Sequence, residues 1–183
     1  MIYRINAGFI PKEHWVQNPN EGGRIIGEVC HFIDTMMYLT NSKPQSIFAR
    51  SLSSNSLENI KDTDNVAITI NFNDGSVGTI IYISMGASNL TKEYFEVHTE
   101  RKSAIMNNFE LVTLYDGKSN KSIKMDGDKG IKNEIKEYIN SLKKGYILIN
   151  FDDLAIVTKT TFAILESIET NRIINLNINN EAI

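Results

Sequence analysis

The chain has 183 residues, of which 42% are hydrophobic and 22% charged, an ordinary balance for a globular protein with one sizeable core. Its net charge is −3, and no basic run or stripe marks it as a nucleic-acid binder. No apolar run approaches the roughly 20 residues of a membrane-spanning helix, and we expect no membrane association and no signal peptide. The single cysteine, Cys30, can form no internal disulfide, which favours a reducing, cytoplasmic compartment.

The first 44 residues predict a strand, a loop and a helix. Residues 1–7 alternate in the manner of a strand, and two prolines and a glycine pair make residues 9–23 a loop. We expect a helix from about Arg24 to Leu39, where the following asparagine and proline stop it.

The middle of the chain predicts strands and the end predicts helices. Seven segments have the period-two alternation of strands: 45–52, 65–72, 77–85, 93–99, 104–107, 111–115 and 122–125. Short turns such as Asn73-Asp74-Gly75 favour an antiparallel meander with one parallel edge. Two helices follow, over 131–143 and from a cap at Asp152 or Asp153 to about Glu169, and residues 172–178 form a short strand or tail.

This order predicts a single α+β domain over residues 1–183, with a large, mostly antiparallel open β-sheet and helices packed on one face. The segment Ile80-Ile81-Tyr82-Ile83 is apolar on both alternations, which is typical of a strand buried on both faces. We therefore expect the open face to form a homo-oligomer interface. The alternative is a single central strand whose second face is covered by a loop.

The predicted first helix carries Glu28, His31 and Asp34 at steps of three, on a segment that is otherwise apolar on almost every side. Titratable groups on one stripe of a buried helix are costly unless they are hydrogen-bonded, and such stripes often perform acid–base chemistry. The structural alternative makes His31 a satisfied core histidine, Glu28 a first-turn acid favoured by the helix dipole, and Asp34 a hydrogen-bond acceptor.

Several common motifs are missing from the sequence. It contains no GxGxxG dinucleotide fingerprint, no GxxxxGK[ST] phosphate loop and no GxSxG elbow. Glu28 and His31 supply at most two ligands, so we expect no metal, although a small metal-dependent hydrolase is one hypothesis. Cys30, in apolar surroundings, is expected to be structural rather than nucleophilic.

Gly22-Gly23, followed by His31-Phe32-Ile33-Asp34 on the predicted helix, resembles the signature helix of the glucose–fructose oxidoreductase and inositol dehydrogenase (Gfo/Idh/MocA) family. The order of the elements resembles the C-terminal domain of that family over nearly the whole chain. The stretch from Tyr3 to Pro11, with His14-Trp15-Val16, resembles most closely a branch associated with polysaccharide biosynthesis.

The resemblance implies that this chain is one of the two domains of an oxidoreductase. Family members place an N-terminal Rossmann domain before an α/β domain that binds substrate and oligomerises, and we expect that Rossmann domain to be absent from this chain. NAD or NADP would then be bound mainly by the missing domain, with none expected for this chain alone. The substrate would be a sugar or sugar-like polyol, and the chain alone would be inactive. The alternative is a stand-alone, non-catalytic binding or scaffold module.

The resemblance also implies site residues. His31 falls on the family's catalytic or substrate-orienting histidine. The family usually has an aspartate one turn before it, where this sequence has Gly27, so Glu28 is the nearest acid and the second catalytic candidate. The candidates for substrate contacts are Arg4, Asn6, Lys12, His14 and Trp15. Trp15 can equally be a loop anchor packed on the helix.

Overall fold

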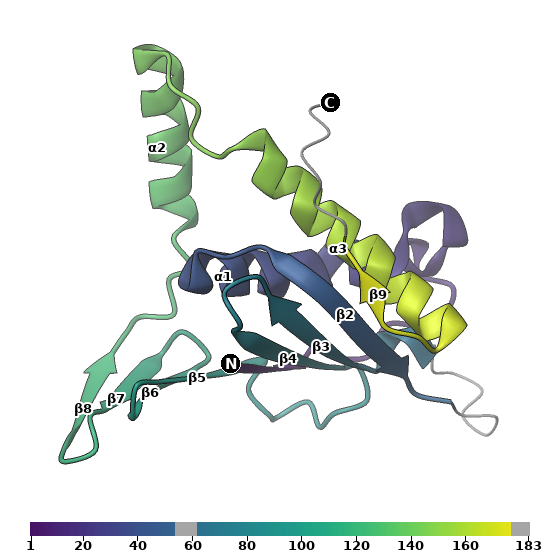
Figure 1. Ribbon diagram of the computed structural model, residues 1–183, viewed down its shortest axis with the longest axis horizontal. Coiled ribbons are helices and arrows are strands. Elements are labelled where there is room, and N and C mark those ends of the chain that lie inside the picture. Colours follow the sequence, from purple (N-terminus) through teal and green to yellow (C-terminus); the bar gives the residue numbers. More distant parts are fainter. Residues whose placement is uncertain (54–61, 177–183) are drawn as a thin grey trace.

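The computed structural model describes residues 1–53 and 62–176, and a nine-stranded sheet runs across them (Figure 1). The strands are β1 (Ile2–Asn6), β2 (Pro44–Ser51), β3 (Val66–Phe72), β4 (Val77–Ile83), β5 (Glu93–Thr99), β6 (Lys102–Asn107), β7 (Leu111–Tyr115), β8 (Asn120–Lys124) and β9 (Ile174–Asn175). Their order across the sheet is β8-β7-β6-β5-β1-β4-β3-β2-β9. The α+β class and the open, mostly antiparallel sheet are confirmed.

The one parallel pair among these strands joins β1 to β4 at the centre of the sheet, so the predicted parallel edge is wrong. Tyr3 lies opposite Ile80 in the parallel register and opposite Phe95 of β5 in the antiparallel one. The reason is the connection. The chain leaves β1 through a loop and a helix rather than a hairpin, and a long crossover permits parallel pairing.

Three α-helices accompany the sheet: α1 (Cys30–Thr40), α2 (Ile131–Lys144) and α3 (Phe151–Thr170). A π-helical turn, Ile25–Val29, leads directly into α1. The cap of α3 is Asn150, whose side chain accepts a hydrogen bond from the Asp152 amide at 3.1 Å, so the predicted aspartate caps are wrong. Asn150 adopts the extended backbone that an N-cap requires, and both aspartates fall in the first turn.

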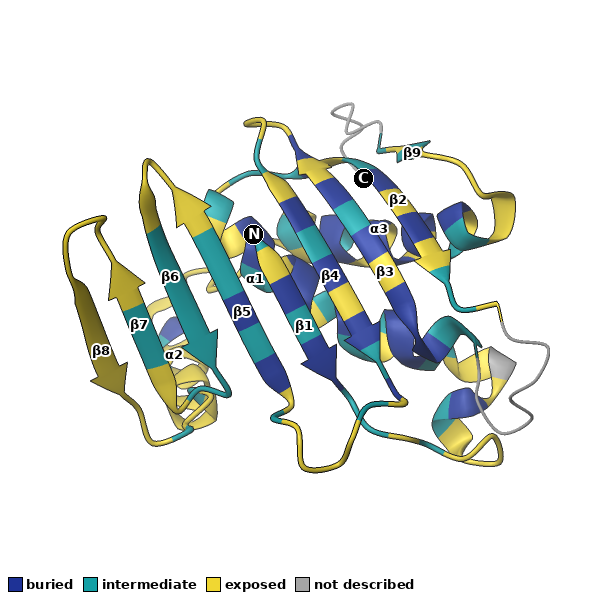
Figure 2. Ribbon diagram, turned by 90° about the horizontal axis from the view of Figure 1, so that it is seen from below, coloured by how far each residue is buried: buried dark blue, intermediate teal, exposed yellow. Residues whose placement is uncertain are grey.

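Helices α1 and α3 cover one face of the sheet, which we call the helix side (Figures 1 and 2). The core lies between them and β1 to β4, where Ile80 and Tyr82 are fully buried. The residue between them, Ile81, is 37% exposed on the opposite, open face. The alternation therefore puts one apolar set in the core and leaves a second set on the open face. That second set consists of Ile2, Phe48, Val77, Ile81 and Ile83.

Helix α2 departs from the predicted packing, because it projects away from the sheet on the helix side of β5–β8 instead of lying against the strands (Figures 1 and 2). Its apolar stripe is largely exposed, and consists of Ile131, Ile135, Tyr138, Ile139 and Leu142. The amphipathic pattern thus predicted the helix correctly, but no sheet surface in the described part of the chain covers its apolar stripe.

Ser167 of α3 completes the outer edge of β2. The short β9 pairs only with Ser46 and Ile47, and beyond it the Ala49 amide donates to Ser167 Oγ at 2.9 Å. The same hydroxyl donates to the Arg172 carbonyl at 2.7 Å, and the side chain is fully buried. A helix hydroxyl therefore takes the place of a strand carbonyl.

We expect Ser167→Ala to lower the free energy of unfolding by about 1–3 kcal/mol, because it leaves the buried Ala49 amide without an acceptor. Urea unfolding followed by circular dichroism measures the change. Thr170→Ala, on the exposed side of the same helix, is the matched control and should stay within about 0.5 kcal/mol of wild type. Equal effects of the two substitutions would contradict the edge-capping role.

Candidate active site

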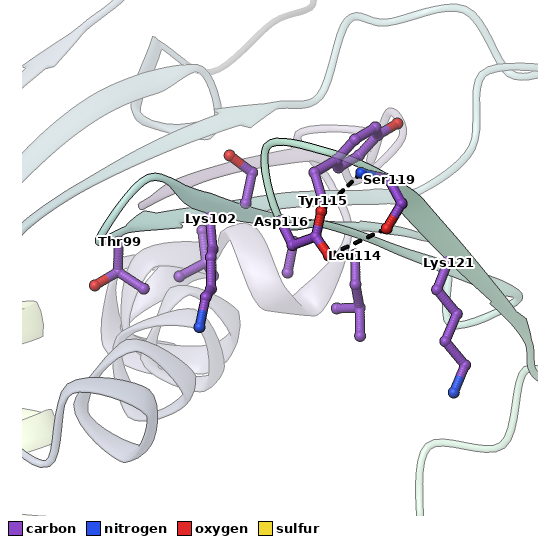
Figure 3. Close-up of a pocket in the computed structure, with 10 residues that line it drawn as sticks. Thr99, Lys102, Leu114, Tyr115, Asp116, Ser119 and Lys121 are labelled. Carbon is purple, nitrogen blue, oxygen red and sulfur yellow. Dashed lines mark hydrogen bonds between the residues drawn. The ribbon is translucent and has the colours of Figure 1, made fainter.

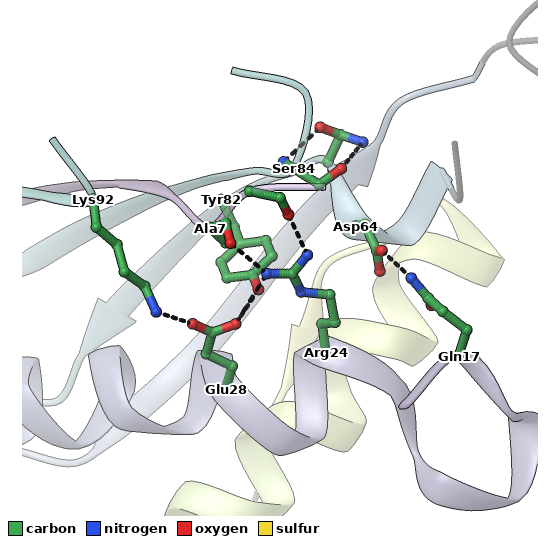
Figure 4. A network of polar contacts seen from close by, with 10 residues as sticks. Ala7, Gln17, Arg24, Glu28, Asp64, Tyr82, Ser84 and Lys92 are labelled. Atoms are coloured by element: carbon green, nitrogen blue, oxygen red, sulfur yellow. Dashed lines mark hydrogen bonds and ion pairs between the residues drawn. The ribbon is translucent and has the colours of Figure 1, made fainter. Parts of the chain in front are cut away.

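The carboxylate of Glu28 is the centre of a polar network on the helix side (Figure 4). It lies in the π-helical turn, where its Oε1 accepts from Lys92 Nζ at 2.7 Å. Its Oε2 accepts from the Tyr82 hydroxyl and from Arg24 Nη2, the latter at 3.3 Å. Three donors from the helix start, from β4 and from the β4–β5 loop therefore converge on one anion. π-Helical turns are frequent at functional sites.

Arg24 ties this network to the end of β1. Its side chain is buried and donates to the Gly8 carbonyl at 2.7 Å and to the Ala7 carbonyl at 3.0 Å. Its guanidinium lies 5.1 Å from the centre of the Tyr82 ring. The backbone that opens the 9–23 loop is thereby fixed to the first turn of the helix.

The ionisation of the network is set by these contacts. Burial raises the pKa of Glu28, but the hydrogen bonds from Lys92 and Tyr82 and the nearby positive charges outweigh it, so the pKa is lowered. Burial and the bond to Glu28 raise the pKa of Tyr82 far above its usual range. Near neutral pH, Glu28 is therefore an anion and Tyr82 a neutral donor. This environment suits a fixed charge that orients its neighbours better than a group that exchanges protons.

His31 and Asp34 are exposed, so the expected buried stripe of three titratable groups is wrong. Helix α1 buries one side, with Ile33 and Met36 fully covered, and turns His31 outward. The physical reason is that the helix lies on the outside of a two-layer structure. The imidazole of His31 is thus available at the surface, three residues after the half-buried, charged Glu28.

The predicted substrate residues of β1 lie on the other side of the sheet from His31. Tyr3 packs against Phe32 of α1 with ring centres 4.8 Å apart, and the alternation turns Arg4 to the open face. Arg4 donates to the Thr91 carbonyl at 2.6 Å. Asn6 donates to two carbonyls of the β4–β5 loop, at 2.8 and 3.1 Å. Both side chains are therefore engaged within the protein.

The other three predicted substrate residues lie together in the 9–23 loop. Lys12 and His14 are exposed, and Trp15 is 68% exposed, which rules out a tightly packed anchor. The His14 ring accepts from the Val16 amide at 3.3 Å and lies beside Trp15, with ring centres 5.7 Å apart. The loop is held by Gln17, which is buried and donates to the Asp64 carboxylate (Figure 4).

Sequence reasoning missed Tyr82, Lys92 and the site role of Arg24. The spacing of Arg24 and Glu28 by four residues was an available signal, because such pairs face one another on a helix. No local signal identifies Tyr82 or Lys92, since only the parallel placement of β1 beside β4 brings them to the helix. Cys30 is half-buried, and burial raises its pKa.

The described part of the chain contains neither a cluster of metal-binding side chains nor a helix that could span a membrane. Within residues 1–53 and 62–176, no group of three or more His, Cys, Asp or Glu side chains is arranged to hold a metal ion. Among the helices of that same part of the chain, none is long and apolar enough to cross a membrane.

We expect Glu28→Gln to lower the free energy of unfolding near pH 7 by about 1–3 kcal/mol, because charge-assisted bonds to Arg24 and Lys92 are lost. The folded pKa of Glu28 lies below its ordinary value of 4.5, so the stabilisation is complete above that pH. It is lost as the pH falls through the lower, folded value. The difference between wild type and variant should therefore shrink below pH 4.5.

Urea midpoints at pH 7, 5, 4 and about 3 test this expectation. Glu169→Gln, on the exposed surface of α3, is the control and should stay within about 0.5 kcal/mol of wild type at each pH. A Glu28→Gln deficit that is the same at pH 7 and at the acid end would contradict the assignment of a lowered pKa.

Several solved structures that are named as dehydrogenases or oxidoreductases contain this fold within a longer chain. Levoglucosan dehydrogenase, in complex with NADH and levoglucosan, superposes with a TM-score of 0.78 at 15% identity over 97% of this chain and 58% of its own. Aldose–aldose oxidoreductase from Caulobacter crescentus, complexed with glycerol, gives 0.77 at 13% identity over 96% and 55%. UDP-N-acetylglucosamine 3-dehydrogenase from Acidithiobacillus ferrooxidans gives 0.73 at 12% identity over 92% and 53%.

The chain thus spans little more than half the length of these structures, and at such identities they share its fold. A comparison with curated proteins gave no match. The family model of the GFO/IDH/MocA C-terminal domain matches residues 3–105, which include β1, the signature helix and the strands through most of β6. The match extends over more than half of the chain, and the protein therefore belongs to the GFO/IDH/MocA family through its C-terminal domain.

Proposed function

We propose that this chain is the substrate-binding and oligomerisation domain of an NAD(P)-dependent oxidoreductase that acts on a sugar or sugar-like polyol. The observation that carries the proposal is the exposed His31 on the signature helix of a GFO/IDH/MocA domain, three residues after Glu28 and its polar network. Structural relatives named for levoglucosan, aldose and UDP-N-acetylglucosamine oxidation or reduction support the substrate class. The lone Cys30 supports a cytoplasmic location.

The described residues do not fit a dinucleotide. Such cofactors bind where a parallel strand, a glycine-rich turn and a helix N-terminus meet, within a doubly wound parallel sheet. Here the sheet is antiparallel except at β1–β4, and β1 leads into an irregular loop rather than directly into a helix. We infer that a separate domain holds NAD or NADP and that the 183-residue chain alone turns over no substrate. The role of this chain in the reaction is then to transfer the proton of the substrate hydroxyl.

In this proposal His31 accepts or returns the proton of the reacting hydroxyl. An imidazole can both accept and donate a proton, which suits this task, and the side chain projects from α1 without a protein partner among the described residues. Glu28 is a positioning residue. Its charge fixes Lys92, Tyr82 and Arg24, and through Arg24 it fixes the loop that carries Lys12, His14 and Trp15.

Those three loop residues are the proposed substrate contacts, because an exposed cation, imidazole and indole suit the hydroxyls and apolar ring face of a sugar. Arg4 and Asn6 would affect substrate binding only indirectly, because their side chains hold the β4–β5 loop in place. Gly27, where the family has an aspartate, favours the alternative of a binding or scaffold module without chemistry.

We expect His31→Ala to lower kcat/KM roughly 100-fold or more when the chain is assayed together with a dinucleotide-binding domain of the family, because general acid–base catalysis contributes that much. His98→Ala, on the far side of the sheet, is the control and should retain activity. Circular dichroism verifies folding. Unchanged turnover by His31→Ala would favour the scaffold module. Dehydrogenase activity of the chain alone would contradict the proposal that a separate domain binds the cofactor.

The open face is the proposed homo-oligomer interface. We expect Ile81→Asp to weaken self-association at least tenfold in analytical ultracentrifugation, because it places a charge among the apolar residues of β4 and β1. Tyr38→Asp is the control, since Tyr38 is 83% exposed on α1. Loss of association by Tyr38→Asp instead would place the contact on the helix side.

A further inference from the structure

A hollow of about 420 Å³ lies on the β5–β8 part of the sheet (Figure 3), and none of the residues that line it belongs to the Glu28 network. Its floor is a cross-strand row in which Val97 pairs with Ala104, Ala104 with Leu114 and Leu114 with Lys121. Val97 follows the buried Phe95 by two residues, so the row lies on the helix side. The volume is within the range of about 300–1,000 Å³ that small-molecule sites occupy.

Two lysines flank the apolar floor. Figure 3 shows Lys102 and Lys121 projecting to the same side as Leu114, whereas Tyr115 points to the opposite side. The register explains this arrangement, because Lys102 pairs with Thr99 and Lys121 with Leu114. Neither ammonium forms an ion pair or hydrogen bond within residues 1–53 and 62–176. Two positive charges over an apolar floor therefore have no counter-ion in that part of the chain.

The acid at the rim, Asp116, forms no ion pair with these lysines. The Asp116 carboxylate accepts from the Lys118 amide at 2.9 Å and from the Ser119 amide at 2.7 Å, and also from the Ser119 hydroxyl. These bonds lower the pKa of Asp116 and commit its oxygens to the β7–β8 turn, as Figure 3 shows.

The local charge has the opposite sign to the rest of the molecule. Residues 99–125 contain five basic and three acidic side chains, although the whole chain carries a net charge of −3. With only two lysines at the hollow, the surface lacks the extended cationic stripe of a nucleic-acid site. The combination instead matches a compact ligand that is anionic at one end and apolar at the other.

We propose that this hollow binds an amphipathic organic anion, with the apolar part on the Val97–Ala104–Leu114 row and a carboxylate or phosphate between Lys102 and Lys121. The site is independent of the proposed oxidoreductase chemistry, because none of its residues belongs to the Glu28 network. A carboxylate and a phosphate monoester satisfy the same two ammonium groups, and the experiment separates them.

Isothermal titration of the 183-residue chain with octanoate and with octyl phosphate, both below micellar concentration, tests the site. At least one should bind, and the tighter of the two identifies the head group. Inorganic phosphate and octanol should each bind at least tenfold more weakly, because each lacks one half of the recognition. Lys102→Gln and Lys121→Gln should each weaken binding at least fivefold.

Lys124→Gln is the matched control, because Lys124 lies on the same strand as Lys121 and pairs with Leu111, on the opposite face. It should leave binding unchanged. Leu114→Ser tests the apolar floor and should weaken octyl phosphate binding but not any residual binding of inorganic phosphate. No binding of either anion at millimolar concentration would overturn the proposal, as would equal losses for Lys124→Gln and Lys121→Gln.

Discussion

The position of β1 between β4 and β5 is the constraint on which the rest of the structure depends. Its parallel register with β4 places Tyr82 under the first turn of the signature helix, and its antiparallel register with β5 places Tyr3 against Glu93. The carbonyls of Ala7 and Gly8, which follow β1, accept hydrogen bonds from the buried guanidinium of Arg24. Without this strand, the sheet would divide into two antiparallel halves, and Glu28 would lose the framework that fixes its partners.

Local patterns predicted the elements well, because hairpin turns and period-two alternation are determined by neighbouring residues. The segments that became β2 to β7 agree with the alternation of the sequence, and the turn at Asn73-Asp74-Gly75 joins β3 to β4 as expected. The central parallel pair was missed because strand order is decided by a long crossover, for which the sequence has no local marker. The exposed position of α2 was missed because an amphipathic stripe predicts a partner surface but not its location.

The same distinction applies to the site. Glu28 and His31 were identified from helix spacing, and Arg24 was within reach of the same argument. Tyr82 and Lys92 reach Glu28 from segments 54 and 64 residues away, so only the tertiary fold reveals them. The alternation of β1 was sufficient to predict the orientation of Arg4, since a strand that buries Tyr3 and Ile5 must turn Arg4 to the other face.

Alternation along β4 separates the two proposed roles of the domain. Tyr82 donates to Glu28 on the helix side, and its neighbour Ile81 faces outward among the exposed apolar residues of the open face. Because consecutive side chains of a strand point to opposite faces, the outward residues can change to suit a partner while the inward residues keep the charge network. Under the proposed function, one strand therefore carries both association and site geometry, and a one-residue slip in its register would disrupt both together.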